Sequence, residues 1–245
     1  MADLNERLVA RPSARTEVID QGLRSYMLRV YNYMAVGLGL TGIAAVATFM
    51  AAVDNGQLTS FGQLLFASGF RWVVIFAPLA LVLFLSFRVQ SMSVAAAQLI
   101  FWIYAGLVGV SFASLGLVYA HESIARVFFI TAASFGGLSL WGYTTKRNLT
   151  GMGSFLFMGL IGLILASLVN LFLQSSAMQF VISAVGVLVF AGLTAYDTQR
   201  IKEMYFEADD AATAGRKAIM GALTLYLDFI NMFLMLLQLF GNRNN

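Results

Sequence analysis

Seven long apolar runs constrain this chain more than any other feature of its sequence. Most are close to the 20 or so residues that an α-helix needs to cross the hydrocarbon core of a bilayer. The runs cover residues 30–53, 72–87, 94–120, 124–143, 154–173, 178–200 and 218–240. Only 11% of the residues are charged, whereas soluble domains contain about 25%. The sequence therefore predicts an all-α integral membrane protein with seven transmembrane helices.

The polar stretches divide the chain into a single transmembrane domain, 30–240, between an amino-terminal tail, 1–29, and a short carboxyl-terminal tail, 241–245. The stretch 54–70 is too polar to cross a membrane and is expected to form an interfacial hairpin. The connection 201–217 carries Glu203, Glu207, Asp209 and Asp210. We expect a solvated loop there, with attraction of cations as the alternative.

The distribution of basic residues predicts the orientation. Of the 15 Lys and Arg residues, 12 lie in the amino-terminal tail and in the second, fourth and sixth connections. Because cytoplasmic segments carry the excess of Lys and Arg, the amino terminus is expected in the cytoplasm and the carboxyl terminus outside. The hairpin at 54–70 would then face outward. The absence of Cys and of an evident retention signal favours a bacterial inner membrane.

An acid in the last run is the most informative polar residue. Asp228 lies about ten residues into that run, where a charge costs at least about 2.5 kcal/mol. Thr224, Asp228, Asn231 and Gln238 follow one another at spacings of four, three and seven, which places them on one helix face. That face must meet protein or water, so the last helix is expected to be central in the bundle.

A second acid, Asp197, follows Thr194 near the end of the sixth run and is the natural partner of Asp228. If the two meet, burial and the neighbouring carboxylate both disfavour the doubly ionised state. The pair would share a proton and titrate as one unit, as a pH sensor does. Arg88, at the end of the second run, would compete for one acid as a latch. A transient calcium contact is also expected, although two carboxylates fall short of the usual six to eight oxygens.

The segment GLTAYDTQRIK, the Asp in the last run and the Arg after the second run resemble the Bax inhibitor family, also called the transmembrane Bax inhibitor motif proteins, of the bacterial type. The resemblance covers residues 31–240. It implies a last helix surrounded by the other six and a pH-sensitive calcium leak channel that acid favours. Carried across, the sensor role falls on Asp197 and Asp228 and the latch role on Arg88.

Two other functions compete with a leak channel. A non-conducting regulator would bind membrane proteases or cell-death factors, with the acids pinning the sixth and seventh helices. An intramembrane aspartyl protease is the remote alternative, because Tyr196-Asp197 matches the first half of its motif. No Gly-x-Gly precedes Asp228, however, and the Pro-Ala-Leu motif is missing.

The remaining chemistry is limited. The only histidine, His121, leaves no triad or histidine cluster, and there is no Cys. We therefore expect no enzyme, no catalytic residue and no cofactor. The expected partners are calcium ions, protons and the lipid bilayer, with membrane proteins as further candidates. Nucleic acid is not expected, since the positive-inside pattern already explains the net charge of +3.

Overall fold

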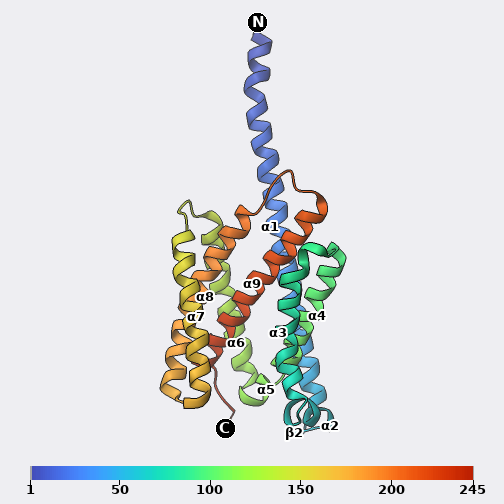
Figure 1. The fold of residues 1–245 in the computed structure, drawn as a ribbon, viewed down its shortest axis with the longest axis vertical. Helices are drawn as coiled ribbons and strands as arrows, with labels where there is room; N and C mark the ends of the chain where they lie inside the picture. The colour runs from blue at the N-terminus through green and yellow to red at the C-terminus, as the bar shows by residue number, and fades with distance from the viewer. Residues whose placement is uncertain (1, 245) are drawn as a thin grey trace.

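The computed structural model describes residues 2–244, with side chains from residue 19 to residue 244. Within this part of the chain, seven helices are long and apolar enough to cross a membrane, and the two ends of the chain lie at opposite ends of the bundle (Figure 1). These spans are Ile19–Ala52, Arg71–Ser91, Val94–Val118, His121–Thr144, Thr150–Leu173, Ser176–Glu203 and Ala211–Phe240. The predicted all-α, seven-span membrane fold is confirmed.

The chain folds as a series of helices with one short hairpin. The long helices are α1 (Ala2–Ala52), α3 (Arg71–Arg88), α4 (Val94–Phe112), α6 (His121–Thr144), α7 (Thr150–Leu173), α8 (Ser176–Glu203) and α9 (Ala211–Phe240). The short elements are β1 (Val53–Asp54), β2 (Gln57–Leu58), α2 (Ser60–Gly62), the π-helix Gln63–Ala67, the 3₁₀-helix Val89–Ser91 and α5 (Leu115–Val118). Ser93, Ser175 and Asp210 begin α4, α8 and α9, and each side chain accepts a hydrogen bond from a backbone N–H in the first turn, as N-cap residues do.

Helix α1 begins well before the predicted first run, which started at residue 30. Tyr26, Met27 and Val30 are buried in the bundle, and the ring of Tyr26 lies 5.8 Å from that of Tyr205. Residues 19–29 therefore belong to the packed bundle, because their apolar side chains find partners on it. The rest of the predicted tail falls on residues 1–18, whose side chains lie outside the described part of the chain.

The hairpin after α1 and the carboxyl-terminal tail both have defined structure. β1 and β2 form an antiparallel hairpin, and Asn55 and Gly56 at its turn both have positive φ, 48° and 78°, as a type I′ turn requires. The predicted hairpin is thus present, within 53–58. At the other terminus, Asn242 O accepts a hydrogen bond of 3.0 Å from Ala120 N, so the tail 241–244 folds back on the end of α5; residue 245 lies outside the description.

The connection between α8 and α9 is shorter than predicted, because both helices continue into it and leave only 204–210. Two of its acids are used in holding α9. Asp209 Oδ2 lies 2.6 Å from Lys217 Nζ, and Asp210 accepts from Thr213 N. These contacts give Asp209 and Asp210 a structural role, whereas Glu207 of the same loop is exposed.

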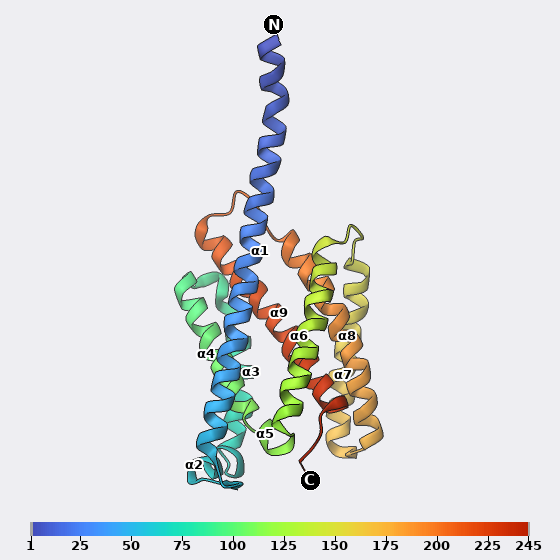
Figure 2. The ribbon, with the colours of Figure 1, turned by 180° about the vertical axis from the view of Figure 1, so that it is seen from behind.

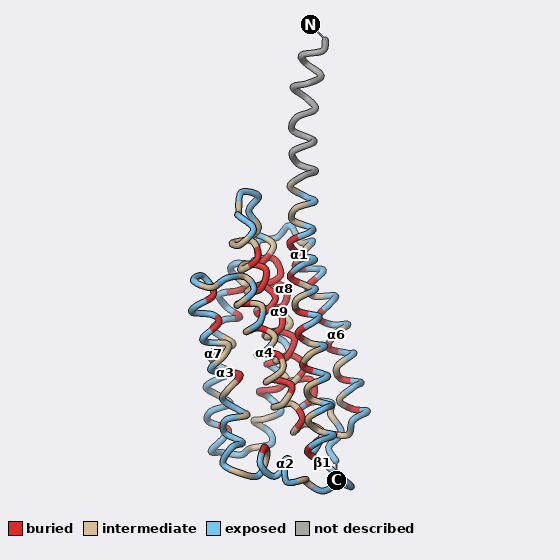
Figure 3. The backbone as a smooth tube through the Cα atoms, turned by 90° about the vertical axis from the view of Figure 1, so that its right-hand side faces the viewer, coloured by how far each residue is buried: buried red, intermediate tan, exposed pale blue. Residues whose placement is uncertain are grey.

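Helix α9 is the most buried span. Buried residues make up 67% of its most apolar 18-residue segment, against 39% for α8 and less for the other spans, and red buried residues follow it in Figure 3. It packs against α1, α4, α6 and α8, whereas α3 packs mainly on α4 and α7 mainly on α8. That the last helix is surrounded by all six others stays a prediction.

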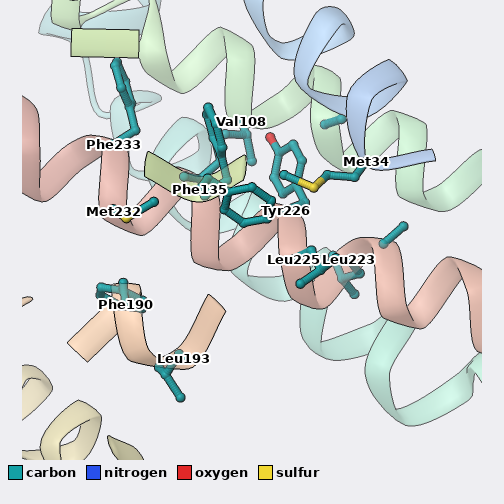
Figure 4. Close-up of a cluster of buried hydrophobic side chains, with 14 of the residues drawn as sticks. Met34, Val108, Phe135, Phe190, Leu193, Leu223, Leu225, Tyr226, Met232 and Phe233 are labelled. Carbon is teal, nitrogen blue, oxygen red and sulfur yellow. The ribbon is translucent and has the colours of Figure 1, made fainter. Parts of the chain in front are cut away.

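The densest part of the core lies where α9 meets α1 and α4. Tyr226 of α9 is fully buried, with the rings of Phe101 and Tyr104 at 5.9 and 5.6 Å and with Met34 and Val108 beside it (Figure 4). Its hydroxyl lies 2.6 Å from that of Thr41. Buried hydroxyls are costly unless paired, and this pair satisfies both.

Candidate functional site

A cavity of about 920 Å³ lies between α7, α8 and α9, a volume within the range of ligand pockets. Apolar side chains, mainly from α7, form most of its wall. Helix α7 adds two serines, Ser154 and Ser167, and the other charged and polar side chains come from the two helices that carry the predicted sensor. They are Tyr196, Asp197 and Arg200 of α8 and Thr224, Asp228 and Asn231 of α9.

The register of α8 against α9 brings the two acids to the same cavity. Gly221 of α9 lies against the side chain of Ile201 of α8. From that contact Asp228 is seven residues along α9 and Asp197 is four residues back along α8, about 10 and 6 Å at 1.5 Å per residue. Helix α9 begins at Ala211, ten residues before Gly221, whereas α8 ends at Glu203, two residues after Ile201, which offsets the unequal distances of the acids from their helix ends.

Asp197 and Asp228 are 7% and 5% exposed, and their side chains are close enough to hydrogen-bond to each other. Two carboxylates can only accept, so such a bond requires that one acid carry a proton. Asp228 Oδ2 is buried and has no hydrogen-bond donor beside it among the described residues. The arrangement can therefore hold one shared proton, and its loss leaves an acceptor without a donor.

Arg200 is the basic residue at this site, and sequence reasoning gave it no role. It lies three residues after Asp197 on α8, lines the same cavity, and its positive charge acts on Asp197. The i, i+3 spacing, which places two residues on neighbouring positions of one helix face, was the available signal.

The predicted latch, Arg88, is not brought to the acids. It is exposed at the end of α3, lies outside the cavity and forms no ion pair with any side chain described in 19–244. The adjoining 3₁₀-helix, Val89–Ser91, contacts α9. The latch therefore stays a prediction, and it would require a conformation other than this one.

The polar residues predicted near the sensor, which are those of the last helix together with Thr194 of α8, lie in three different places. Thr224 and Asn231 line the cavity but donate to carbonyls of their own helix, Met220 O at 3.1 Å and Leu227 O at 2.8 Å. Thr194 is fully buried, donates to Phe190 O and does not line the cavity. Gln238 accepts from Gln179 and Ser183 near the start of α8.

The two residues after Asp197 explain why this part of α8 is polar. Thr198 joins a row of hydroxyls in which Ser139 Oγ lies 2.9 Å from Thr198 Oγ1 and 2.7 Å from Tyr31 OH. Gln199 accepts from Leu149 N and donates to Arg147 O, at 2.9 and 2.8 Å. The segment Asp-Thr-Gln thus faces the cavity, α6 and the α6–α7 connection in turn, which fixes the orientation of α8 beside the acids.

The site offers a metal ion few protein ligands. Within the described residues there is no group of three or more His, Cys, Asp or Glu side chains placed to hold one. Two carboxylates supply at most four of the six to eight oxygens that calcium takes. A calcium ion here would keep much of its water, so the contact predicted for Asp197 and Asp228 would be transient.

Comparison with known proteins gives a consistent result over nearly the whole chain. The family model described as "Inhibitor of apoptosis-promoting Bax1" matches residues 23–245. An uncharacterized protein of Rickettsia prowazekii is 49% identical over 95% of this chain and 96% of its own. Inner membrane protein YbhL of Escherichia coli is 48% identical over 91% and 93%, and an uncharacterized membrane protein of Streptococcus pyogenes is 33% identical over 92% and 96%.

Proposed function

Since the chain belongs to the Bax inhibitor family of membrane proteins, and since its cavity holds a buried acid pair, we propose that it is a pH-sensitive calcium leak channel in which Asp197 and Asp228 form the sensor. The observation that carries the proposal is that two buried carboxyl groups from neighbouring helices line the same cavity. The YbhL relative is an inner membrane protein by name, and we place this chain in the same membrane, with its amino terminus in the cytoplasm.

The physical basis is the energy of two like charges in a medium of low dielectric constant. The repulsion between two like charges grows as the dielectric constant falls. A pair of acids that shares a proton can therefore stay together, whereas a fully ionised pair must separate, become hydrated or recruit a cation. The cavity allows two of these outcomes. Arg200, which lies beside Asp197, is a cation that the ionised pair can recruit, and the cavity has room for water.

In the proposed cycle, the ionised pair attracts a guanidinium group and the protein is closed. Arg200 is already at the cavity, and Arg88 would reach it only after α3 moves. Protonation removes that attraction and releases the helices that line the cavity, so acid favours conduction, in the sense that the family resemblance implies. A hydrated calcium ion then passes the acids with one or two carboxylate contacts.

The test is calcium efflux from liposomes that contain only this protein, measured from pH 6 to pH 8. We expect efflux to rise toward pH 6 in the native protein and to lose this dependence in Asp197→Asn and Asp228→Asn. Glu207→Gln is the matched control, because Glu207 is an exposed acid in the α8–α9 connection, and it should behave as the native protein does. Unchanged pH dependence in both Asn variants would remove the sensor assignment.

A non-conducting regulator is the second candidate, favoured by the description of the matched family as an inhibitor of a protein that promotes apoptosis. In that role the acid contact would pin α8 to α9 and bind a membrane protein elsewhere. If liposomes that contain the folded native protein show no calcium efflux at any pH, the regulator role would be supported. The protease alternative has only the two acids in its favour; cleavage of a transmembrane substrate that stops in Asp228→Asn would restore it.

A further inference from the structure

A second cavity, of about 540 Å³, lies on the outer side of α1, where that helix passes α4; the two helices run side by side in Figure 2. Its lining follows one face of α1 from Gln21 to Val36, at helical spacings of three and four, and adds Trp102 of α4. The opposite face of α1 is packed into the bundle, with Met27, Val30 and Met34 buried.

Polarity falls along this face from Gln21 to Val36, with Leu28 as an apolar residue between the two arginines. Arg24 and Arg29 lie toward the amino-terminal end of the cavity, Asn32 and Tyr33 follow, and Val36 and Trp102 close it. From Arg24 to Val36 is twelve residues, or about 18 Å along a helix. A charged end, an intermediate polar zone and an apolar end in this order match a phospholipid headgroup, its ester region and the first part of an acyl chain.

The two arginines lie at the level of the end of α8. Tyr26, between them in sequence, contacts Tyr205, which follows the last turn of α8. Arg24 and Arg29 are exposed, and neither forms an ion pair with any side chain described from residue 19 on. Basic pockets between transmembrane helices at the cytoplasmic surface are suited to anionic headgroups.

We propose that this cavity binds an anionic phospholipid, with Arg24 and Arg29 at the headgroup phosphate and an acyl chain along Val36 and Trp102. The apolar end of the cavity favours a lipid over a free phosphate, which would use only the two arginines.

The test uses Trp102 as its reporter. In the variant Trp72→Phe/Trp141→Phe, Trp102 is the one remaining tryptophan. We expect phosphatidylglycerol with brominated acyl chains to quench its fluorescence at about a tenfold lower mole fraction than brominated phosphatidylcholine, since each basic residue near a membrane surface favours anionic lipid. Adding Arg24→Gln/Arg29→Gln should remove the difference, whereas inorganic phosphate should not displace the lipid.

The matched control is Lys146→Gln/Arg147→Gln, which removes two exposed basic residues at the same end of the bundle but outside the cavity. It should keep the preference for phosphatidylglycerol. Equal quenching by the two lipids, an equal loss in both double variants, or displacement by phosphate would each overturn the proposal. Native mass spectrometry of the unmodified protein, counting retained phosphatidylglycerol, gives the same answer if the tryptophan variant does not fold. Neither readout depends on ion flux.

Discussion

Tyr226 and Asp228 are two residues apart on α9, yet they face opposite environments. Tyr226 is fully buried among aromatic rings and its hydroxyl is paired with that of Thr41. Asp228 faces a cavity of about 920 Å³, and its buried Oδ2 has no hydrogen-bond partner in the described part of the chain. One face of α9 is closed by packing, and the other is left open because α7 packs mainly on α8.

Glycines on the packed side, where α4 meets α1, and on the cavity side, where α7 meets α8, also differ in the space around them. In the absence of a hydrophobic drive inside the membrane, small residues let helices approach closely. A Cβ atom on Gly109 of α4 would strike the backbone of α1, at Thr41 O and at Ala45 N, the latter 3.1 Å away. The three atoms nearest to a Cβ atom on Gly153 of α7 all belong to the ring of Tyr196, a side chain that borders the cavity. The packed face has no room to adjust, whereas the cavity face does.

The largest expected effect is therefore from Gly109→Ala. Forcing two backbones apart costs about 1–3 kcal/mol or more, which exceeds the gain of about 1 kcal/mol from replacing Gly by Ala in a helix. We expect a net loss of unfolding free energy, measured by denaturation in mixed detergent micelles. Gly106→Ala, on the same helix with nothing within 4 Å of the new atom, should lose none.

Gly153→Ala sharpens the comparison between the two faces. Because Tyr196 can turn into the cavity, the variant should lose much less stability than Gly109→Ala in the same denaturation assay. Equal losses in the two variants would contradict the description of the α7 side as adaptable.

The next effect is on ion flux. Ser167 of α7 lines the cavity and makes no hydrogen bond among the described side chains, so Ser167→Leu fills the space without removing an interaction. If the cavity lies on the ion path, efflux should fall about tenfold, which corresponds to about 1.4 kcal/mol in the barrier, with the fold unchanged. Ser86→Leu on the exposed face of α3 is the control. Normal efflux in Ser167→Leu would place the ion path elsewhere.

Much of the fold could be predicted, because a membrane requires about 20 apolar residues in each span and the chain has seven such runs. The ends of the spans were less predictable. Residues 19–29 look like a tail by charge, but Tyr26 and Met27 are buried by partners that are distant in sequence. Likewise, polar residues hid the continuation of α8 and α9 into the predicted loop, where Asp210 acts as the cap of α9.

The candidate site could be predicted only in its acids. Asp197 and Asp228 stand out because charges in spans are costly, and the structure brings them together. Which side chain accompanies them depends on helix rotation and packing, which one sequence does not determine. Arg88 therefore lies away from the cavity in this conformation, while Arg200 and the hydroxyl row at Thr198 were not assigned a role.

A smaller effect is expected from Tyr226→Phe on the packed face. The variant removes the hydroxyl that pairs with Thr41, but Thr41 keeps Ala105 O at 2.9 Å as an acceptor. The loss should be about 1 kcal/mol of unfolding free energy, the typical net value of one hydrogen bond. Tyr104→Phe is the control, since this neighbouring ring makes no side-chain hydrogen bond within the described chain and should lose less. Efflux and its pH dependence should not change in either variant, because both lie away from the cavity.

The smallest effect is at the cap of α9, which serves neither face. The hydrogen bond from Thr213 lowers the pKa of Asp210. A carboxyl with a lowered folded-state pKa stabilises the protein above its unfolded pKa, about 3.9, and this contribution is lost as pH falls through the folded-state value. Asp210→Ala should therefore lower the melting temperature slightly at pH 7, and the difference from the native protein should shrink as pH falls through the lowered folded-state pKa, where the native carboxyl also becomes neutral. Because this window lies well below pH 6, Asp210→Ala should keep the pH dependence of efflux. A change in that dependence would mean that the start of α9, and not the Asp197–Asp228 pair alone, takes part in sensing pH.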